Sequence, residues 1–314
     1  MVDPKIDGAA KPFVCLCVPT FHRPAGLRKL LLHVNRLDYP GRLMVIVVDN
    51  DVDQRAGAAV VQDMSSTLCY PLKCVVEPRR GQTFAYNRAF LEACRTQPPC
   101  DYVAVLDDDE FPEPGWLTEL MKIALQHWAD ITGGPVFPIF EEPNHWLAKS
   151  GLFGPARYPT GRVPMIYGSG NMMIRRDILD QYLDEPFLNE LAFVGGSDQD
   201  FFWRCRRDGR SFAWADNARV YEATPSARLS IRFMLRRRFR NGTEATLLER
   251  KGLGSAIGAP MRWLKGLALL TAGIVSLPIC ALGGRRSMMT SLIWAARGAG
   301  RIAAEFNFYD EQYR

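Results

Sequence analysis

Residues 103–110 read VAVLDDDE, and no other stretch of the chain is as informative. The four apolar residues predict a strand that is buried on both faces of a parallel sheet. Four acids follow at once, and the FPEP at 111–114 stops the strand and forces a turn. Ligands of open α/β sheets bind beyond the carboxyl ends of the strands, and acids this close repel one another unless a cation lies among them. The stretch therefore predicts a site for Mg²⁺ or Mn²⁺, which prefer oxygen ligands, with a solvated acidic turn as the alternative.

The chain of 314 residues is 47% hydrophobic, which is enough for one large α/β domain and an appendage. Its formal net charge of +5 is unevenly distributed, with arginine dense between 204 and 240 and the acids clustered earlier. This asymmetry indicates a basic surface that faces phosphates or anionic lipid, and we expect no nucleic acid partner. The eight cysteines include no CxxC pair, and residues 1–12 are expected to form a flexible leader without a signal peptide. A reducing cytoplasm is the expected compartment.

Segments with strand and helix patterns alternate through the first part of the chain. Strands are expected at 13–18 (ended by Pro19), 43–48, 74–76 and 102–106, and helices at 25–37, 55–64, 84–93, 116–128 and 201–207. The alternation predicts a Rossmann-like, mostly parallel sheet flanked by helices with right-handed crossovers. The polar loops that follow the strands would line one edge of this sheet. Beyond residue 128 the pattern loosens, and 141–160 is expected to form loops over a cleft.

The chain changes character after about residue 225, so we expect a catalytic domain over 1–225 and a membrane-associating helical region over 226–314. Four arginines recur every fourth residue and therefore share one helix face, namely Arg228, Arg232, Arg236 and Arg240. A basic amphipathic helix is typical of a membrane surface. The alternative is a solvated helix packed on the core, and the uncharged segment that follows at 266–284 favours the membrane surface.

Residues 266–284 carry no charge, and their length is near the minimum for a membrane span. The segment contains Pro278 and four glycines, and basic residues flank it on both sides. Basic residues on both flanks disfavour a simple crossing. We therefore expect a re-entrant or in-plane element that anchors the protein, peripheral or monotopic, at the cytoplasmic face of the inner (plasma) membrane.

Five motifs taken together resemble the family 2 glycosyltransferases of GT-A fold. They are PTFHRP at 19–24, VVDND at 47–51, LDDDE at 106–110, GGSDQDFF at 195–202 and RRFRNG at 237–242. Within this family, the chain most resembles the glucosyltransferases of succinoglycan-type exopolysaccharide assembly. The resemblance extends over about residues 13–242 and more loosely beyond, and it implies an enzyme that inverts the anomeric carbon.

The resemblance implies roles at the donor for residues that match these motifs. Pro19, Thr20 and Arg23 would lie in the loop around the nucleotide base and ribose. Asp49 would accept a hydrogen bond from the uracil ring, a role that suits a carboxylate facing an imide N–H. Asn87 is also expected to contact the donor.

The acidic stretch matches the family's Asp-x-Asp pattern. By that resemblance, Asp109 would bind Mg²⁺ or Mn²⁺ directly, and Asp107 would bind the metal or the ribose. Asp108 is expected at the donor site, where it and Glu110 would support the other two acids or face solvent. The cation would offset the charge on the departing nucleoside diphosphate.

The family places its catalytic base at an Asp just before a helix, and here that position is Asp198. It would take the proton of the acceptor hydroxyl, which attacks from the face opposite the leaving group. The alternative is a helix N-cap, a role that Asp200 could also fill. By the same resemblance, Arg238 and Arg240 would reach either the donor pyrophosphate or a lipid pyrophosphate.

The chain departs from the family's pattern at three positions. Ser197 stands where the family usually has Glu, Tyr86 replaces the Arg that often precedes Asn87, and Tyr221 stands where many relatives have a His near the metal. These departures leave open the orientation of the acceptor, the nucleotide contacts near Asn87 and the third protein ligand of the metal.

The resulting hypothesis is a membrane-associated, metal-dependent inverting hexosyltransferase. It would move glucose or another hexose from a UDP-sugar to a glycan carried on a polyprenyl diphosphate. One alternative is a sugar nucleotidyltransferase, which normally carries a Gly-rich loop near the N-terminus, whereas 19–24 has no glycine. The other is a non-catalytic membrane scaffold with the same fold, which the intact Asp107, Asp109 and Asp198 disfavour.

Overall fold

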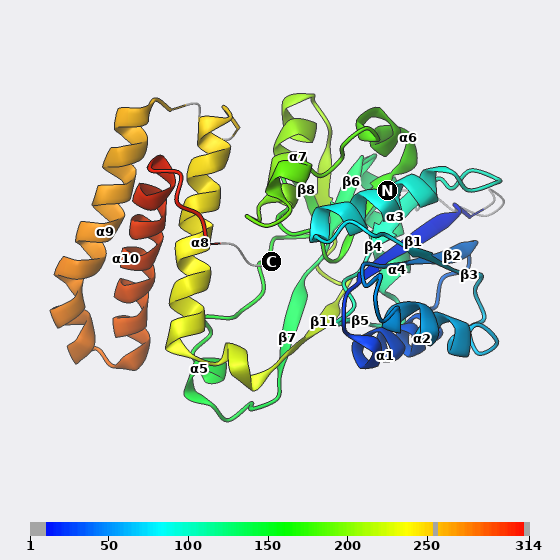
Figure 1. Cartoon of the computed structure of the whole chain (residues 1–314), viewed down its shortest axis with the longest axis horizontal. Helices are drawn as coiled ribbons and strands as arrows, with labels where there is room; N and C mark the ends of the chain where they lie inside the picture. Colours follow the sequence, from blue (N-terminus) through cyan, green and yellow to red (C-terminus); the bar gives the residue numbers. More distant parts are fainter. Residues whose placement is uncertain (1–10, 254–256, 311–314) are drawn as a thin grey trace, which may run out of the picture. The chain divides into compact units, whose positions relative to one another are not determined.

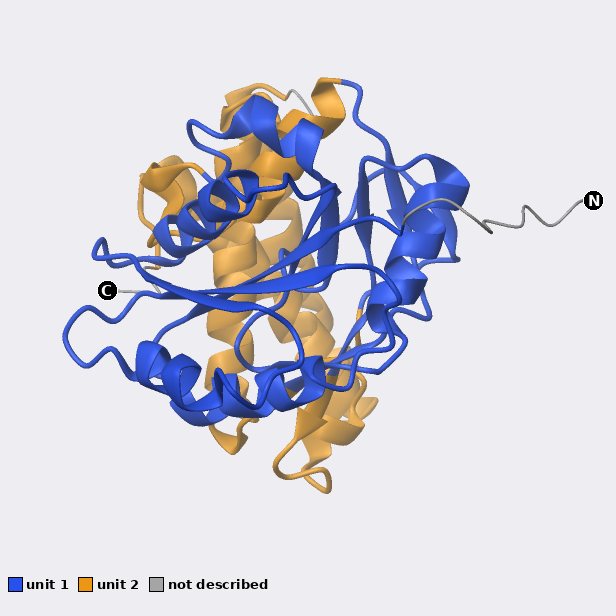
Figure 2. Cartoon of the chain, turned by 90° about the vertical axis from the view of Figure 1, so that its right-hand side faces the viewer, with its two compact units in different colours: residues 1–137, 156–187, 209–222 blue, residues 138–155, 188–208, 223–314 orange. Residues whose placement is uncertain are grey.

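The computed structural model describes residues 11–253 and 257–310, which form two compact units (Figures 1 and 2). Unit 1 comprises residues 1–137, 156–187 and 209–222, and unit 2 comprises residues 138–155, 188–208 and 223–314. The units therefore interleave along the chain, and the last passage between them, at 222/223, lies close to the expected boundary at 225/226. That domain boundary stays a prediction, and most of the expected leader at 1–12 lies outside the described residues.

Unit 1 is built on an eight-stranded sheet in the order β3-β2-β1-β4-β9-β6-β10-β8. The strands are β1 (Val14–Thr20), β2 (Leu43–Asp49), β3 (Leu72–Val76), β4 (Tyr102–Val105), β6 (Ile131–Gly133), β8 (Gly161–Val163), β9 (Met172–Arg175) and β10 (Phe212–Trp214). The first four strands are parallel, whereas β9 runs antiparallel to both of its neighbours. The mostly parallel sheet that the alternation predicts is thereby confirmed.

Helices lie on both sides of this sheet, as the blue part of Figure 2 shows. They are α1 (Pro24–Val34), α2 (Ala56–Met64), α3 (Gln82–Cys94), α4 (Trp116–His127) and α6 (Arg176–Leu179), with one turn of 3-10 helix, η1 (Asp180–Tyr182). α3 packs on β1 and β2 and buries Ala85, Ala89 and Phe90. These helices cover a sheet whose central strands, β1 and β4, are almost completely buried.

β1 continues through Pro19 to Thr20, so the prediction that Pro19 ends the strand is wrong. β4 pairs with β1 only as far as Cys17, which lies opposite Val105. Pro19 therefore has no neighbouring strand on that side, and its missing N–H removes no hydrogen bond from the sheet. The longer strand carries Thr20 to a position beside Asp49, at the end of β2.

A second, three-stranded sheet has the order β5-β11-β7. Its strands are β5 (Glu110–Pro112), β7 (Val136–Phe140) and β11 (Val220–Thr224). β5 follows the acidic loop directly and pairs antiparallel with β11, which places Glu222 opposite Glu110. The small sheet thus brings a further acid next to residues 107–110.

Unit 2 is mainly helical. Its helices are α5 (Trp146–Lys149), η2 (Asn189–Leu191), α7 (Ser197–Arg207), η3 (Ser226–Arg228), α8 (Ile231–Arg250), α9 (Ala259–Leu282) and α10 (Arg285–Glu305). α10 packs along both α8 and α9, and glycines allow the backbones to approach closely. A Cβ atom at Gly242 of α8, for example, would collide with the carbonyl oxygen of Arg297 in α10.

α8 contains most of the predicted basic helix, but its arginines do not share one environment. Arg228 lies before the helix in η3, Arg232 and Arg236 are exposed, and Arg240 is buried at 8% exposure. α8 packs against α10 within its own unit, and the role of this helix at a membrane surface stays a prediction.

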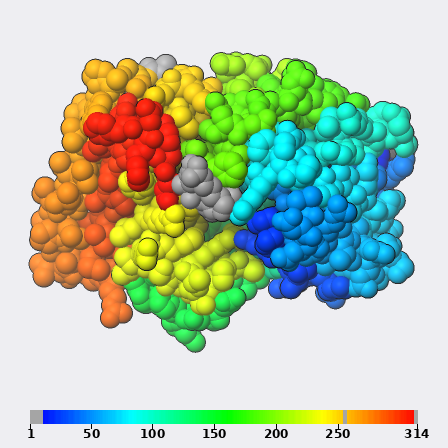
Figure 3. Space-filling view, in the orientation of Figure 1, coloured from blue at the N-terminus to red at the C-terminus, as the bar shows by residue number. Residues whose placement is uncertain are grey.

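α9 is one continuous helix that runs through Pro278. Among the residues that the structure describes, it is the one helix long and apolar enough to cross a membrane by length and composition, with a mean hydropathy of 1.8 in its most apolar window. Only 11% of that window is buried. Large apolar side chains are exposed toward its end, including Val275 (73%), Ile279 (75%) and Leu282 (91%). Figure 3 shows α9, in orange, as part of the molecular surface.

Candidate active site

The loops after β1, β2 and β3 are joined at the carboxyl edge of the sheet in unit 1. Asn50 N donates to the carbonyl oxygen of Thr20 at 2.9 Å, which links the ends of β1 and β2. The buried Asn50 side chain donates to the carbonyls of Glu77 (2.9 Å) and Arg79 (2.8 Å) in the loop after β3. Asn50 was not among the predicted site residues, although its place directly after a strand is the same signal that marks Asp49.

Asp49 is fully buried, and both of its carboxylate oxygens accept backbone N–H groups. Oδ1 accepts from Asp51 N at 3.0 Å, and Oδ2 accepts from Ala58 N at 2.8 Å in the first turn of α2. A carboxylate at this position satisfies an unpaired N–H and interacts favourably with the helix dipole. These bonds fix the Asp49 side chain in the β2 loop, and its contact with a uracil ring stays a prediction.

Asp108 points into the protein from the acidic loop and is 5% exposed. Its carboxylate accepts hydrogen bonds from Thr20 Oγ1 at 2.8 Å and from Arg23 Nη1 at 3.0 Å. Burial raises the pKa of Asp108, and the Arg23 charge and the Thr20 hydroxyl oppose that rise. Three residues predicted at the donor thus contact one another. The expectation that Asp108 and Glu110 could face solvent is wrong, because both side chains are buried.

Asp107 has a different set of contacts. The Tyr86 hydroxyl donates to Asp107 Oδ1, and Ser169 Oγ donates to the Tyr86 hydroxyl at 3.0 Å. Glu110 Oε2 accepts from Asp107 N at 2.9 Å. Burial, followed by the charge of Asp109, raises the pKa of Asp107. Tyr86, where an Arg was expected from the resemblance, satisfies Asp107 with a hydrogen bond but does not neutralise its charge.

Asp109 accepts a hydrogen bond from Arg23 Nη1 at 2.7 Å, so one guanidinium contacts both Asp108 and Asp109. The described residues include no group of three acids, histidines or cysteines that could hold a metal as they stand. The donor set nevertheless suits Mg²⁺ or Mn²⁺, because it consists of carboxylate oxygens. The mutual repulsion of these acids contributes to the raised pKa of Asp107 and of Glu110, and a cation would relieve it.

Glu222 is an acid of this cluster that the sequence patterns did not reveal. It lies on β11 opposite Glu110, and its charge contributes to the raised pKa of Asp107 and of Glu110. Tyr221, the position expected near the metal, lies on the other face of the strand, where its hydroxyl donates to Glu113 Oε1 at 2.7 Å. Side chains alternate between the two faces of a strand. The residue of β11 that points toward the acidic loop is therefore Glu222, the neighbour of the expected Tyr221.

Asn87 is engaged by the backbone of Phe187. Its Nδ2 donates to Phe187 O at 2.7 Å, and its Oδ1 accepts from Phe187 N at 2.9 Å. Both residues belong to unit 1, and the two bonds hold residue 187 against α3. The role of Asn87 toward the donor, like that of Pro19, stays a prediction.

Asp198 belongs to unit 2 and lies in the first turn of α7. The residue at the N-cap position is Gly196, which has a left-handed backbone and no side-chain cap, so neither Asp198 nor Asp200 is the N-cap. Asp198 is half-buried, and its Oδ1 accepts from Gln199 N at 2.8 Å. Asp200 instead forms a buried ion pair with Arg204 Nε at 2.8 Å. The N-cap alternative for these two acids is therefore wrong.

Arg238 and Arg240 lie two residues apart on α8. Arg238 is half-buried, whereas Arg240 is buried. Arg238 Nη2 donates to Leu152 O at 3.3 Å, and its buried Nε has no hydrogen-bond partner among the described residues. Burial, followed by the positive charges of Arg237 and Arg297, lowers the pKa of Arg238. An anion would therefore be stabilised beside Arg238, as the predicted pyrophosphate contact requires.

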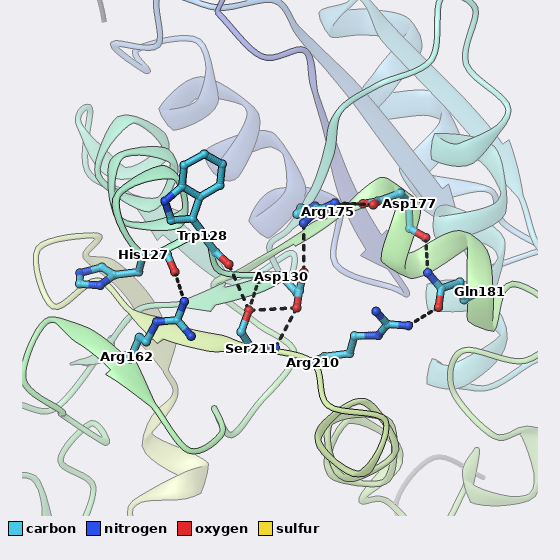
Figure 4. A network of polar contacts seen from close by, with 9 residues as sticks. All are labelled: His127, Trp128, Asp130, Arg162, Arg175, Asp177, Gln181, Arg210 and Ser211. Carbon is cyan, nitrogen blue, oxygen red and sulfur yellow. Dashed lines mark hydrogen bonds and ion pairs between the residues drawn. The ribbon is translucent and has the colours of Figure 1, made fainter. Parts of the chain in front are cut away.

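The opposite edge of the unit 1 sheet carries a network of paired polar groups (Figure 4). Asp130 Oδ2 accepts from Ser211 N at 2.8 Å and from Ser211 Oγ at 2.9 Å, and Asp130 Oδ1 accepts from Arg175 Nη1 at 3.2 Å. Arg175 also donates to Asp177. A cavity of about 520 Å³ lies at this edge, lined by residues 99–102 and 175–177. None of the predicted site residues lines it, and its Arg175 and Asp177 are already paired with each other.

The sequence profile described as Glycosyl transferase family 2 matches residues 15–183, more than half of the chain. A curated relative, the succinoglycan biosynthesis protein ExoM of Rhizobium meliloti (strain 1021), is 30% identical over 282 residues. The match covers 88% of this chain and 88% of the relative.

Solved structures share the fold over nearly the whole chain. The mannosyltransferase PcManGT from Pyrobaculum calidifontis, in complex with GDP-Man and Mn²⁺, gives a TM-score of 0.63 at 19% identity, covering 96% of this chain and 90% of that one. Residues 1–349 of S. aureus TarS give TM-scores of 0.52 with UDP and 0.51 with UDP-GlcNAc, at 14% identity over 96% of this chain and 97% of that one. At such identities the likeness concerns the fold alone, and it confirms the predicted GT-A architecture.

Proposed function

The chain belongs to glycosyl transferase family 2, and from that premise we propose that it transfers a hexose from a UDP-sugar to a lipid-linked glycan in bacterial polysaccharide assembly. The family and the succinoglycan relative make it a glycosyltransferase of polysaccharide synthesis. The observation that supports the finer proposal is the cluster of mutually repelling acids, buried or half-buried, at the carboxyl edge of the sheet, next to the loops after β1 and β2.

The donor would lie along that edge. Two of the fold neighbours hold a nucleotide sugar, and one of these also holds Mn²⁺, which supports a nucleotide-sugar donor here. Mg²⁺ or Mn²⁺ would be held by Asp107 and Asp109, with Glu222 as the third carboxylate, and when bound would offset the charge on the departing nucleoside diphosphate. Pro19 and Thr20 at the end of β1, and Arg23 in the loop that follows, would enclose the base and ribose. The remaining donor contacts would come from Asp49, Asn87 and Asp108.

Asp198 would act as the base. It takes the proton of the acceptor hydroxyl while the acceptor oxygen bonds to the anomeric carbon, and the bond from that carbon to the nucleoside diphosphate breaks. Attack from the face opposite the leaving group inverts the anomeric centre. Arg238 and Arg240 would bind pyrophosphate oxygens, and the field of like charges around Arg238 supports an anion there.

The exposed apolar side of α9 supports binding at a membrane, where a polyprenyl-diphosphate acceptor would reside. Arg285 and Arg286 follow α9 directly, and Trp294 of α10 is 44% exposed. Arginine near anionic headgroups and tryptophan at the interface are typical of membrane-bound proteins. We place the protein at the cytoplasmic face of the inner (plasma) membrane, as a peripheral or monotopic enzyme.

The release of UDP from UDP-sugars, measured with and without Mn²⁺, tests this function. The proposal requires metal-dependent UDP release that speeds up when a lipid-diphosphate glycan is added. Release of pyrophosphate from UTP and a sugar phosphate would instead identify a nucleotidyltransferase. If neither reaction occurs although UDP binds, the chain is a scaffold and the proposal fails.

The membrane role can be tested without removing helices. Truncation after residue 253 would also remove α10, which packs on α8, so substitution is the cleaner change. We expect replacement of Ile274, Val275 and Ile279, which are 57%, 73% and 75% exposed, by serine to lower binding to anionic liposomes by at least about tenfold. UDP binding should be unchanged. Equal sedimentation of variant and wild type with liposomes would show that α9 is not the anchor.

A further inference from the structure

Two arginines from different helices of unit 2 meet at residues 151 and 152, in the loop after α5. Arg238 of α8 donates through Nη2 to the carbonyl oxygen of Leu152 at 3.3 Å. Arg286, in the first turn of α10, lies against Gly151, where a Cβ atom would be 3.7 Å from Arg286 Nη2. Because Gly151 and Leu152 are consecutive residues, the two guanidinium groups contact one short stretch of backbone.

The packing of α8 and α10 explains why these arginines come together. Gly242 of α8 packs on the carbonyl of Arg297, and Thr246 Oγ1 donates to the carbonyl of Arg301 at 3.3 Å, so the two helices run parallel. Their first turns therefore lie at the same end of unit 2. Figure 1 shows α5 at this end, together with the turn between α9 and α10.

Both guanidinium groups have donors to spare. An arginine carries five N–H donors. Among the residues that the structure describes, Leu152 is the only hydrogen-bond partner of the Arg238 side chain, and neither Arg238 nor Arg286 forms an ion pair. Burial, followed by the charges of Arg237 and Arg297, lowers the pKa of Arg238, which agrees with a place that lacks negative charge. The pair therefore suits an anion with several oxygens, such as a diphosphate.

The surroundings of the pair indicate the source of that diphosphate. Arg286 follows the exposed end of α9, where Ile279 is 75% and Leu282 is 91% exposed. A lipid-linked diphosphate lies at the boundary between apolar chains and water. Such a molecule would place its phosphates at the arginines and its hydrocarbon chain beside the end of α9. The donor diphosphate is assigned instead to the metal at Asp107 and Asp109, which belong to unit 1.

We propose that Arg238 and Arg286, which meet at residues 151 and 152, bind the diphosphate of the lipid that carries the acceptor glycan. The inference rests on the lipid-linked acceptor of the proposed function, and it selects the lipid pyrophosphate over the donor pyrophosphate as the ligand of Arg238. The site binds and orients, and no bond of the carrier is made or broken there. It holds the carrier in the same unit as the proposed base, Asp198.

Binding of farnesyl diphosphate in micelles of a neutral detergent tests the site without turnover. The full chain should bind this compound, and Arg286→Gln should weaken binding about tenfold because charge-assisted hydrogen bonds are lost. Arg286→Lys, which keeps the charge but not the fork of donors, should lose less. Farnesol, which has no phosphate, should not distinguish the variants from wild type. Equal binding of farnesyl diphosphate by wild type and Arg286→Gln would overturn the inference.

Arg285→Gln is the matched control. It removes the same charge at the adjacent position, where the guanidinium lies over the Trp146 ring at 6.0 Å. We expect farnesyl diphosphate to bind Arg285→Gln as it binds wild type, and an equal loss in both variants would mean that only net charge matters, against the inference. Arg286 is exposed, so its replacement should not unfold the protein. Arg238→Gln, compared at equal thermal stability, should lose at least as much binding as Arg286→Gln.

Two further measurements distinguish the sources of the phosphate. UDP binding with Mn²⁺ should be the same in Arg286→Gln and wild type, and a loss of about tenfold would assign the arginine to the donor instead. Vesicles of phosphatidylcholine and phosphatidylglycerol, without prenyl diphosphate, should bind Arg286→Gln and Arg285→Gln equally. A larger loss in Arg286→Gln on these vesicles would assign the site to ordinary lipid headgroups.

The transfer assay separates this inference from the proposed function. In Arg286→Gln, the KM for a lipid-diphosphate glycan should rise about tenfold while kcat is unchanged. If wild type transfers no sugar but binds farnesyl diphosphate through Arg286, the proposed function fails and the diphosphate site stands. If wild type transfers sugar and Arg286→Gln changes neither farnesyl diphosphate binding nor this KM, the inference fails and the proposed function stands.

Discussion

The two edges of the unit 1 sheet both carry acids, but only at the carboxyl edge do several acids crowd together. At the amino ends of β4 and β6, Asp130 is bonded to Ser211 and paired with Arg175 (Figure 4). At the carboxyl edge Arg23 pairs with Asp108 and Asp109, whereas the half-buried Asp107 and the buried Glu110 lie among like charges, and their pKa values are raised. Paired charges contribute to the fold, whereas repelling charges cost stability and are typical of sites that bind a ligand or do chemistry.

Two aspartates within one turn of α7 also differ in their surroundings. Asp200 is 1% exposed and forms ion pairs with Arg204 and Lys251, so its charge is compensated. Asp198, two residues earlier, is half-buried, and its Oδ1 accepts from Gln199 N at 2.8 Å. Sequence position alone does not separate the two aspartates. Their surroundings do, and the surroundings predict opposite outcomes when each carboxylate is replaced.

The largest expected effect is that of Asp198→Asn. The amide keeps the size of the side chain but cannot accept the proton, so transfer should fall by about 10²- to 10⁴-fold while UDP binding is spared. Asp200→Asn is the comparison: it should lower the free energy of unfolding by about 1–3 kcal/mol and reduce the rate less. Steady-state transfer rates and thermal unfolding of both variants check this. A larger rate loss in Asp200→Asn would reverse the two roles.

Asp109→Ala should come next, with a rate loss on the order of 10²-fold, because it removes a carboxylate that we propose as a metal ligand. Arg23 keeps its contact with Asp108, so the fold and weak UDP binding should persist. Asp63→Ala, at an exposed acid that pairs with Arg28, is the control and should behave as wild type. UDP release at a series of Mn²⁺ concentrations checks both. Turnover of Asp109→Ala within about tenfold of wild type would contradict the metal assignment.

The smallest effect on the reaction is expected at the opposite edge. Asp130→Ala leaves Arg175 and Ser211 without a shared partner, so the free energy of unfolding should fall by about 1–3 kcal/mol. The rate of the folded enzyme should not change. Denaturant unfolding and UDP release, measured on the same preparation, test this separation. A tenfold lower rate at unchanged stability would show that the two edges are not distinct in function.

The first half of the fold was predictable because its elements are long and strongly patterned. The strands at 14–20 and 43–49 and the helices α1, α3 and α4 lie within a few residues of their predicted positions. β6, β8 and β10 each contain three residues, which is too short for any period to show, and they pair with partners far along the chain. The predictions for residues beyond 128 were correspondingly loose.

The acids of the candidate site also fall into two groups: those that a local sequence motif reveals and those that only the tertiary structure brings near. Asp107, Asp109 and Asp198 were predictable because each lies in a motif of consecutive residues. Glu222 belongs to no such motif, and only pairing across β5 and β11 brings it near the other acids. The burial of Arg240 was equally hidden, because spacing every fourth residue identifies a shared face but not what covers it.

The order of residues along the chain was enough to predict the family, the alternating α/β architecture, the acidic loop at the end of a buried strand and the apolar character of α9. These properties depend on neighbouring residues, whose spacing sets side-chain direction and burial. Which acids meet and which arginines are buried depend on contacts between residues far apart in the chain. Those contacts exist only after the strands have paired and the helices have packed. They matter because burial and nearby charge, rather than residue type, set the protonation state of each ionisable group.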